Sequence, residues 1–149
     1  GNINHLAALI RTLNRRAEID LVVVAYLQLI RGATKNNARM REQEVAEISR
    51  TLKQLALSEK LPIIALSQLN REATGVPKLS NLRESGAIEQ DADAVLLIYR
   101  PALDGSVEHG PDYGEIHIAK NRRGAAGLAI KFYNQDMAVF SEQPLDRPF

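Results

Sequence analysis

The sequence predicts an α/β protein with a mostly parallel sheet, helices on both faces of that sheet, and antiparallel strands at its C-terminal edge. Short apolar runs at 19–24, 63–67 and 94–99 alternate with segments whose apolar residues recur at helical spacing. After the third run the chain reads as two or three strands in succession. An alternating order followed by consecutive strands is typical of a parallel sheet that ends in an antiparallel edge.

Two amphipathic helices are expected in the first half of the chain. Asn4 is predicted to cap the first helix, whose apolar stripe is Leu6, Leu9, Ile10, Leu13 and Ala17. The second helix carries a stripe formed by Val45, Ile48, Leu52, Leu55 and Ala56. Residues 19–24 are rich in β-branched side chains (Ile19 and Val22 to Val24), which predicts a strand covered on both faces, and 63–67 predicts a second buried strand.

The second half of the chain predicts one short helix and several strands. The acidic segment RESGAIEQDAD (83–93) is expected to be helical before the strand at 94–99. Alternation at 115–119 predicts a further strand. Strands at 128–133 and 137–140 are expected to form a hairpin across Asn134 and Gln135. Polar segments at 31–41, 70–81 and 101–114 are predicted to be loops.

Composition excludes several classes of protein. The chain has 149 residues, a formal net charge of +1, no Cys and three scattered His, so neither a disulfide framework nor a metal site is expected. No apolar run approaches the ~20 residues of a membrane span, and no signal peptide is recognisable. We therefore expect a cytoplasmic protein. Because the sequence begins without Met, we also expect it to be a fragment.

In a parallel sheet, ligands bind at the carboxyl ends of the strands. The residues that leave the predicted strands at that edge are Ala25, Tyr26, Gln68, Tyr99 and Arg100. An amide such as that of Gln68 is suited to orienting a water molecule or contacting a phosphate. A turn residue that satisfies backbone groups is an equally good interpretation of Gln68.

Two further segments carry groups that suit phosphate. KNRRGAAG contains Lys120, Arg122 and Arg123, and guanidinium groups bind phosphate oxygens in pairs, although a solvated hairpin is the commoner meaning of such a run. RESGAIEQ places Gly86 at a predicted helix start, where backbone N–H groups attract phosphate, but an ordinary capped helix explains it better. No GxxxxGK[ST] phosphate-binding loop occurs in the chain.

Five segments taken in order resemble one family. VVVAYLQLIRG, REQEVAEISRTLKQLA, PIIALSQLNR, LRESGAIEQDADAVLLIYR and AKNRRGAAG are similar to the C-terminal half of the ATPase domain of bacterial replicative hexameric DNA helicases, the DnaB family. The resemblance implies a RecA-like P-loop NTPase core in three layers. Residues 1–149 are then part of one such domain, without its upstream phosphate-binding loop and without the glutamate that activates water.

The resemblance also implies roles for individual residues. Gln68 falls on the γ-phosphate-sensing glutamine. Arg122 matches the arginine finger and Lys120 its basic companion, both acting on the nucleotide site of the neighbouring subunit. Arg123 is given no role. Arg83, Glu84 and Gly86 match a loop that holds single-stranded DNA, largely through backbone contacts to phosphates.

Ala25 departs from the family pattern. It stands, beside Tyr26 in the nucleotide site, where the Walker B strand ends in an acid that helps to hold Mg²⁺ through water. Asp20 cannot replace that acid, because it lies ~16 Å from the strand end at ~3.3 Å per residue. The chain by itself is therefore expected to have only weak nucleotide affinity and not to hydrolyse ATP.

The resemblance implies an ATP-dependent helicase that translocates on single-stranded DNA as a homo-hexamer, with ATP and Mg²⁺ bound in the complete protein. Primase and a helicase loader are the partners it implies. The alternative hypothesis, favoured by Ala25 and by the missing phosphate-binding loop, is a non-catalytic RecA-like module for DNA binding or oligomerisation.

Overall fold

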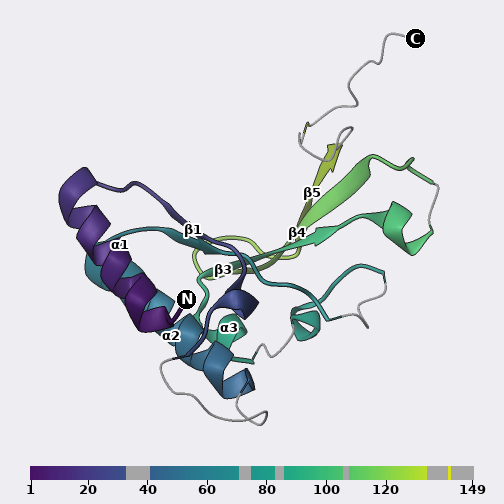
Figure 1. Ribbon diagram of the computed structural model, residues 1–149. Coiled ribbons are helices and arrows are strands. Elements are labelled where there is room, and N and C mark those ends of the chain that lie inside the picture. Colours follow the sequence, from purple (N-terminus) through teal and green to yellow (C-terminus); the bar gives the residue numbers. More distant parts are fainter. Residues whose placement is uncertain (33–40, 71–74, 83–85, 106–107, 134–140, 142–149) are drawn as a thin grey trace. The chain divides into compact units, whose positions relative to one another are not determined.

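The computed structural model describes residues 1–32, 41–70, 75–82, 86–105, 108–133 and 141. The chain forms two compact units, one of Gly1–Asn70 with Ser80–Ala92, the other of Arg71–Leu79 with Asp93–Phe149. Helices α1, α2 and α3 and strands β1 and β2 belong to unit 1, whereas strands β3, β4 and β5 belong to unit 2 (Figure 1). Each unit has a sheet of its own.

Helix α1 spans Ile3–Ala17, and its cap lies just outside the helix. The side chain of Asn2 accepts a hydrogen bond of 2.8 Å from the backbone N–H of Asn4, which satisfies one of the free donors of the first turn. Asn2 is therefore the capping residue, and the prediction that Asn4 has this role is wrong.

The face of α1 that is buried differs from the predicted apolar stripe. Ile3, Ala7 and Ile10 are buried, whereas Leu9 and Leu13 are exposed. Apolar residues in this helix occur on more than one face, so helical spacing alone does not decide which face enters the core.

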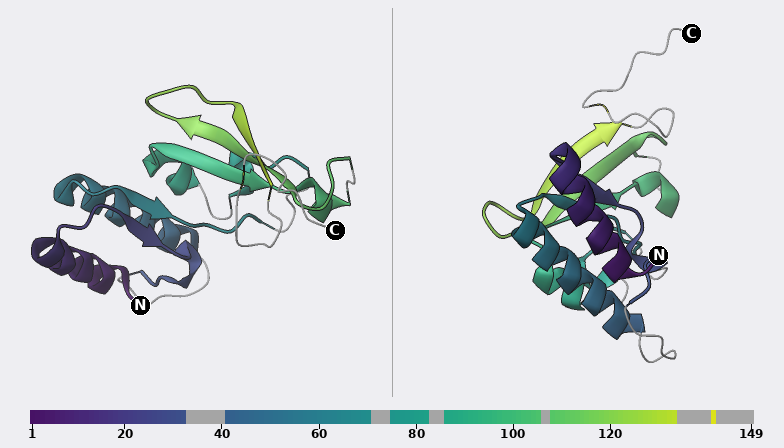
Figure 2. Two further views of the ribbon diagram at one scale, coloured as in Figure 1. Left: turned by 90° about the horizontal axis from the view of Figure 1, so that it is seen from above. Right: turned by 60° about the vertical axis from the view of Figure 1, so that its left-hand side comes forward.

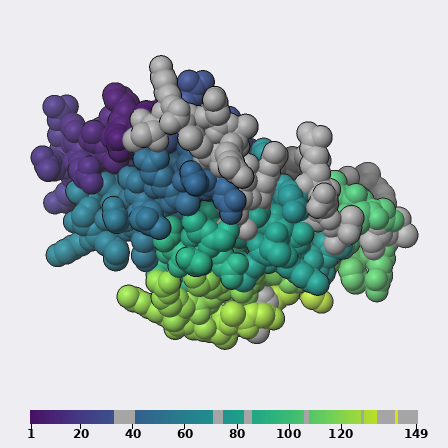
Figure 3. All heavy atoms as spheres, turned by 90° about the horizontal axis from the view of Figure 1, so that it is seen from below, coloured from purple at the N-terminus to yellow at the C-terminus, as the bar shows by residue number. Residues whose placement is uncertain are grey.

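Helix α2 spans Arg41–Glu59 and confirms its predicted stripe. Its buried residues are Val45, Ile48, Ser49, Leu52 and Leu55. Leu55 has no exposed surface, and truncating such a side chain to Ala typically costs about 2–5 kcal/mol. The short helix α3, Gly86–Asp91, buries Ile88. It contacts α2, and the two segments adjoin in blue and teal in Figure 3.

Strands β1 (Val22–Val24) and β2 (Ile63–Ala65) form a parallel pair in which Val24 lies opposite Ala65. The helices α1 and α2 pack on the face that carries Val22 and Ile63 (Figure 1). The cluster on that face is formed by the buried residues Ala7, Ile10, Leu55 and Leu61.

The opposite face of this parallel pair is open among the residues that the structure describes. Val23 is 58% exposed and Ile64 is 50% exposed. The prediction that these strands are buried on both faces is wrong for this chain, because α1 and α2 both use the face of Val22 and Ile63.

Unit 2 contains an antiparallel sheet in the order β3-β4-β5. The strands are β3 (Ala94–Tyr99), β4 (Tyr113–Asn121) and β5 (Leu128–Tyr133), and Figure 2 shows them side by side. The mixed α/β class is thus confirmed. The antiparallel strands at the C-terminal edge are confirmed as well. However, β3 was also expected to join the parallel strands, whereas among the described residues β1 and β2 pair with each other and β3 pairs with β4.

Several predicted segments fall wholly or partly outside the described residues. These are the loop at 31–41 over residues 33–40, the loop at 70–81 over 71–74, the helical segment at 83–93 over 83–85, the loop at 101–114 over 106–107, and the strand at 137–140 with its turn at Asn134 and Gln135. An antiparallel bridge joins Tyr133 to Ser141 on either side of that last segment.

Candidate functional site

The carboxyl ends of β1 and β2 lie next to each other in unit 1. The backbone N–H of Leu66 donates to the carbonyl of Val24 at 2.8 Å, and the N–H of Leu27 donates to the carbonyl of Leu66 at 2.9 Å. The two strands therefore leave the sheet at one edge, as expected. Ala25, which follows β1, and Gln68, three residues beyond β2, are both exposed.

The side chain of Gln28 joins the segments that follow the two strands. Its amide nitrogen donates to the hydroxyl oxygen of Ser67 at 2.9 Å. Its amide oxygen lies 3.5 Å from the backbone nitrogen of Gln68. One partly buried amide thus holds the backbone beside Gln68, a residue that itself keeps part of its surface in solvent.

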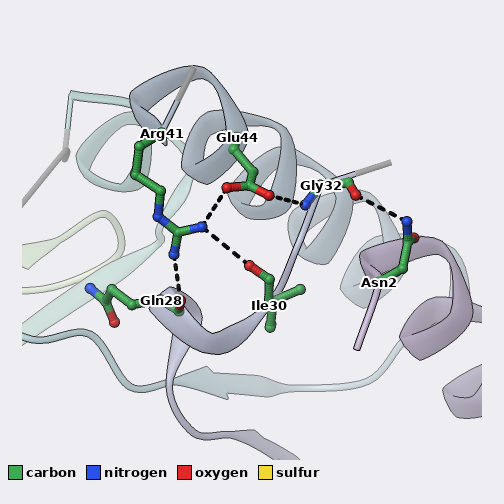
Figure 4. A network of polar contacts seen from close by, with 6 residues as sticks. All are labelled: Asn2, Gln28, Ile30, Gly32, Arg41 and Glu44. Carbon is green, nitrogen blue, oxygen red and sulfur yellow. Dashed lines mark hydrogen bonds and ion pairs between the residues drawn. The ribbon is translucent and has the colours of Figure 1, made fainter. Parts of the chain in front are cut away.

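Side chains at the start of α2 hold the backbone around the 3₁₀ helix η1, Leu27–Leu29. Figure 4 shows the guanidinium of Arg41 between the carboxylate of Glu44 and the backbone carbonyls of Gln28 and Ile30. Arg41 and Glu44 lie three residues apart on one helix, which places them on the same face. These contacts fix the turn from which Gln28 projects.

Glu44 extends this network to the chain that leaves η1. Its carboxylate accepts a hydrogen bond of 2.6 Å from the backbone N–H of Gly32, whose carbonyl accepts one of 2.9 Å from Asn2 (Figure 4). The hydrogen bond from Gly32 lowers the pKa of Glu44, burial opposes this, and the hydrogen bond from Arg41 adds to the lowering. Glu44 is therefore ionised at neutral pH.

In unit 2, Lys120 and Arg122 lie at the end of β4, where the pairing with β3 is irregular. Leu96 pairs with Ile118 and Val95 pairs with Lys120, so Ala119 has no partner on β3. An extra residue of this kind is a β-bulge, which reverses the facing of the residues beyond it. Lys120 therefore shares the face of Val95 instead of the face of Ile118.

Arg122 makes two contacts with Asp93, the residue before β3. Its backbone N–H donates to the carbonyl of Asp93 at 2.8 Å, and its guanidinium lies 3.1 Å from the carboxylate. The side chains are 50% and 59% exposed. An exposed pair of this kind contributes about 0–1 kcal/mol, so Arg122 is oriented without being fixed.

The opposite end of β4 is packed more tightly. Tyr113 is buried, and its hydroxyl donates to the carboxylate of Glu115 at 2.7 Å. His117 lies 2.7 Å from the other oxygen of that carboxylate. Burial, followed by the contact with Glu115, raises the pKa of Tyr113 to about 12. This cluster anchors the start of β4 and contains none of the predicted site residues.

Of the predicted DNA-binding residues, only Gly86 lies among the described residues, as the first residue of α3. Arg83 and Glu84 lie outside them. Leu82, the residue before Arg83, forms an antiparallel bridge with Leu69, the residue after Gln68. The N–H of Asn70 also donates to the carbonyl of Asn81 at 2.8 Å.

Potential metal ligands are sparse among the described residues. They contain no group of three or more His, Asp or Glu side chains placed to hold a metal, and Ala25 offers no side-chain oxygen at the end of β1. The described helices also include none that is long and apolar enough to cross a bilayer.

A family model described as the DnaB-like helicase C-terminal domain matches residues 1–142. The chain belongs to this DnaB-like helicase family. The DnaB-like chain is 40% identical over 141 residues to the replicative DNA helicase DnaB of Geobacillus stearothermophilus. It is 38% identical over 143 residues to a probable plasmid replicative DNA helicase of Chlamydia trachomatis. These matches cover 89% and 93% of the chain but only 31% and 30% of the relatives.

Solved structures agree with this assignment to the DnaB-like family. One solved ATPase domain is similar with a TM-score of 0.79 at 34% identity, over 89% of this chain and 48% of that one. A DnaB-like replicative helicase, solved in a study of its interactions with primase, has a TM-score of 0.77 at 34% identity, over 89% and 33%. The resemblance seen in the sequence is thus confirmed, and with it the RecA-like fold class.

Sequence reasoning missed the residues that hold the candidate groups in this DnaB-like chain. They are Gln28, Arg41, Glu44 and Asp93. Arg41 and Glu44, three residues apart at a helix start, carried a usable signal. Gln28 contacts residues that lie 39 and 40 positions further along the chain. Asp93 contacts a residue 29 positions further along. No local sequence pattern indicates either contact.

Proposed function

We propose that the chain forms part of an ATP-dependent replicative DNA helicase that translocates on single-stranded DNA and unwinds duplex DNA as a homo-hexameric ring. The observation that carries this proposal is the family match over residues 1–142 together with the replicative helicases among its relatives. The chain spans about a third of those relatives, so the remainder of the ATP site would come from another part of the protein.

In this proposal Gln68 senses the γ-phosphate of ATP bound in its own subunit. Gln68 is exposed and lies beyond the carboxyl edge of β1 and β2, the edge at which parallel sheets bind ligands. The contacts of Gln28 with Ser67 and with the Gln68 backbone support the role, because a group that reads a phosphate must keep its position when the phosphate leaves.

Lys120 and Arg122 would act on the nucleotide of the neighbouring subunit. Charge develops on the phosphate oxygens during transfer, and a guanidinium placed there stabilises it. The exposure of Arg122 after the end of β4 supports a role in trans, since half of its side chain is open to solvent. The chain contributes no described magnesium ligand, so no step is assigned here to the metal.

Single-stranded DNA would be held by Arg83, Glu84 and Gly86, mainly through backbone N–H groups. Primase is a proposed partner because one structural relative was solved in a study of its interactions with primase. A helicase loader and a cytoplasmic location complete the proposal.

The test is an assay of the full-length protein that contains this chain. We expect ATP hydrolysis that single-stranded DNA stimulates, and ATP-dependent displacement of a strand from a forked duplex. Absence of both activities in an assembled ring would refute the proposal.

A second candidate function is a non-catalytic RecA-like module that retains DNA binding or ring assembly. Ala25 favours it, because the acid expected at the end of β1 is absent. Rings that bind single-stranded DNA but neither hydrolyse ATP nor displace a strand would support this second function.

A further inference from the structure

We propose that Asp93 is a positioning residue for Arg122, and that it holds the guanidinium in an outward orientation before the neighbouring nucleotide arrives. The inference rests on the proposed function of Arg122 as a group acting in trans. It assigns a role to a residue outside the proposed catalytic set.

The backbone of Asp93 fixes the position of the Arg122 backbone. Its carbonyl accepts the backbone N–H of Arg122 at 2.8 Å, directly beyond the last ladder pair, in which Ala94 lies opposite Asn121. This contact adds one backbone hydrogen bond beyond the end of β4 and holds Arg122, the first residue of the turn that follows, against the residue before β3.

The turn that follows is also held. The side chain of Asn121 accepts from the backbone N–H of Arg123 at 3.3 Å and donates to the carbonyl of Ala125 at 3.3 Å. At Gly124 an added Cβ would come within 2.6 Å of the Asn121 amide nitrogen. Asn121 therefore packs closely under the turn, next to the half-exposed side chain of Arg122.

The β-bulge sets the facing of Lys120, two residues before Arg122. Because Ala119 has no partner on β3, Lys120 lies opposite Val95. Arg122 follows β4 as the first residue of the turn, and its guanidinium lies 3.1 Å from the carboxylate of Asp93. Two cations thus stand at the end of the hairpin, and Asp93 contacts one of them.

The exposure of the pair matches a positioning role. A guanidinium that must transfer to a phosphate needs an orientation close to the productive one, and a partner that releases it easily. Both side chains are about half exposed, so water screens the attraction and the ion pair is weak. Such a pair narrows the directions that Arg122 samples and still yields to a more highly charged phosphate.

The experiment uses the full-length helicase, assembled as a ring on single-stranded DNA. Asp93→Ala removes the carboxylate and keeps the backbone carbonyl that Arg122 uses. Asp93→Glu keeps the charge on a longer side chain. Asp91→Ala is the matched control, because it removes a carboxylate two residues earlier at the end of α3. Arg122→Ala and the double variant Asp93→Ala/Arg122→Ala complete the set.

We expect Asp93→Ala to lower kcat about tenfold through misorientation of Arg122, with KM for ATP and ring assembly unchanged. Asp93→Glu should recover most of the loss, and Asp91→Ala should behave as wild type. A readout without turnover is the affinity for ADP with aluminium fluoride, a mimic of the transferring phosphoryl group. Asp93→Ala should weaken that affinity and leave the affinity for ADP alone unchanged.

The decisive comparison is the double variant. If Asp93 acts through Arg122, Asp93→Ala causes no further loss once Arg122 is Ala. An additional tenfold loss in the double variant, or equal effects of Asp93→Ala and Asp91→Ala, would overturn the inference. If Arg122→Ala itself leaves hydrolysis unchanged, the proposed role of Arg122 fails and the role of Asp93 fails with it, which is a distinguishable result.

Discussion

The two units hold their candidate functional groups in different ways. In unit 1 the backbone beside Gln68 is part of a partly buried network that runs through Gln28 to Arg41. In unit 2 Arg122 lies beyond the end of a strand, half exposed, beside one half-exposed carboxylate. The first arrangement fixes a position, whereas the second favours a direction.

This difference follows from where each group is proposed to act. A group that reads a phosphate in its own subunit benefits from contacts that do not change during the cycle. A group that acts across a subunit boundary must leave its resting partner each time the ring moves. Rigid placement suits the first role and weak pairing suits the second.

The largest expected effect tests the group in unit 2. Arg122→Ala in the assembled ring should lower kcat by about 10³-fold or more and leave nucleotide binding largely intact, because the guanidinium acts on the transferring phosphoryl group. Steady-state hydrolysis and nucleotide titration measure the two quantities. Equal loss of both would show that Arg122 acts in the site of its own subunit.

The next prediction concerns the acid that is missing at the end of β1, in the same unit as Gln68. Ala25→Asp in the complete protein should raise magnesium-dependent hydrolysis by about 10- to 100-fold, the scale of groups that hold a metal through an intermediate shell. Hydrolysis measured across a magnesium titration tests this. An unchanged magnesium dependence would mean that another group holds the metal.

A smaller effect tests whether Gln68 depends on its network. Gln28→Ala removes both the contact to Ser67 and the contact to the backbone of Gln68, and should lower kcat about fivefold with little change in nucleotide affinity. The matched control is Gln43→Ala, an exposed amide on α2. If the two variants have equal kcat, the contrast between a fixed and a weakly held group does not stand.

The smallest effect concerns stability. Folding lowers the pKa of Glu44 below its ordinary value of 4.5, so its stabilisation is present above that value and is lost as the pH falls through the lowered pKa. Glu44→Gln should reduce the free energy of unfolding at pH 7 by about 1 kcal/mol, since the partly exposed charge is screened. It should also reduce the loss of stability below pH 4.5.

Urea unfolding at pH 7 and in mild acid measures both quantities. Glu42→Gln is the control, because Glu42 lies in the same first turn of α2 and is exposed. If this control loses as much stability as Glu44→Gln, the effect comes from charge near the helix start in general and not from the network.

Elements with a clear pattern of apolar residues in their own segment were predictable from the sequence. The apolar stripe of α2 and the bounds of β3 and β5 agree with the structure for this reason. In α1 the apolar residues occupy more than one face, and packing against Leu55 and Leu61 decides which face is buried.

The supporting residues of the site were not predictable, because each acts on a distant segment. Gln28 contacts Ser67, and Asp93 contacts Arg122, only after the sheets have formed. The bulge was hidden for a related reason. Ile116, Ile118 and Lys120 alternate along the chain as if they shared one face, and only pairing with β3 shows that Ala119 is skipped.

The bulge at Ala119 also gives this strand an unusual tolerance to a change of length. Removing one residue from a strand normally damages the ladder, whereas deleting Ala119 would let β3 and β4 pair without interruption. The same deletion would keep Lys120 opposite Val95 and on the face opposite Ile118, because adjacent residues of an uninterrupted strand face opposite sides. Ala119 is thus a residue whose loss the hairpin can absorb without turning Lys120 to the other face of the sheet.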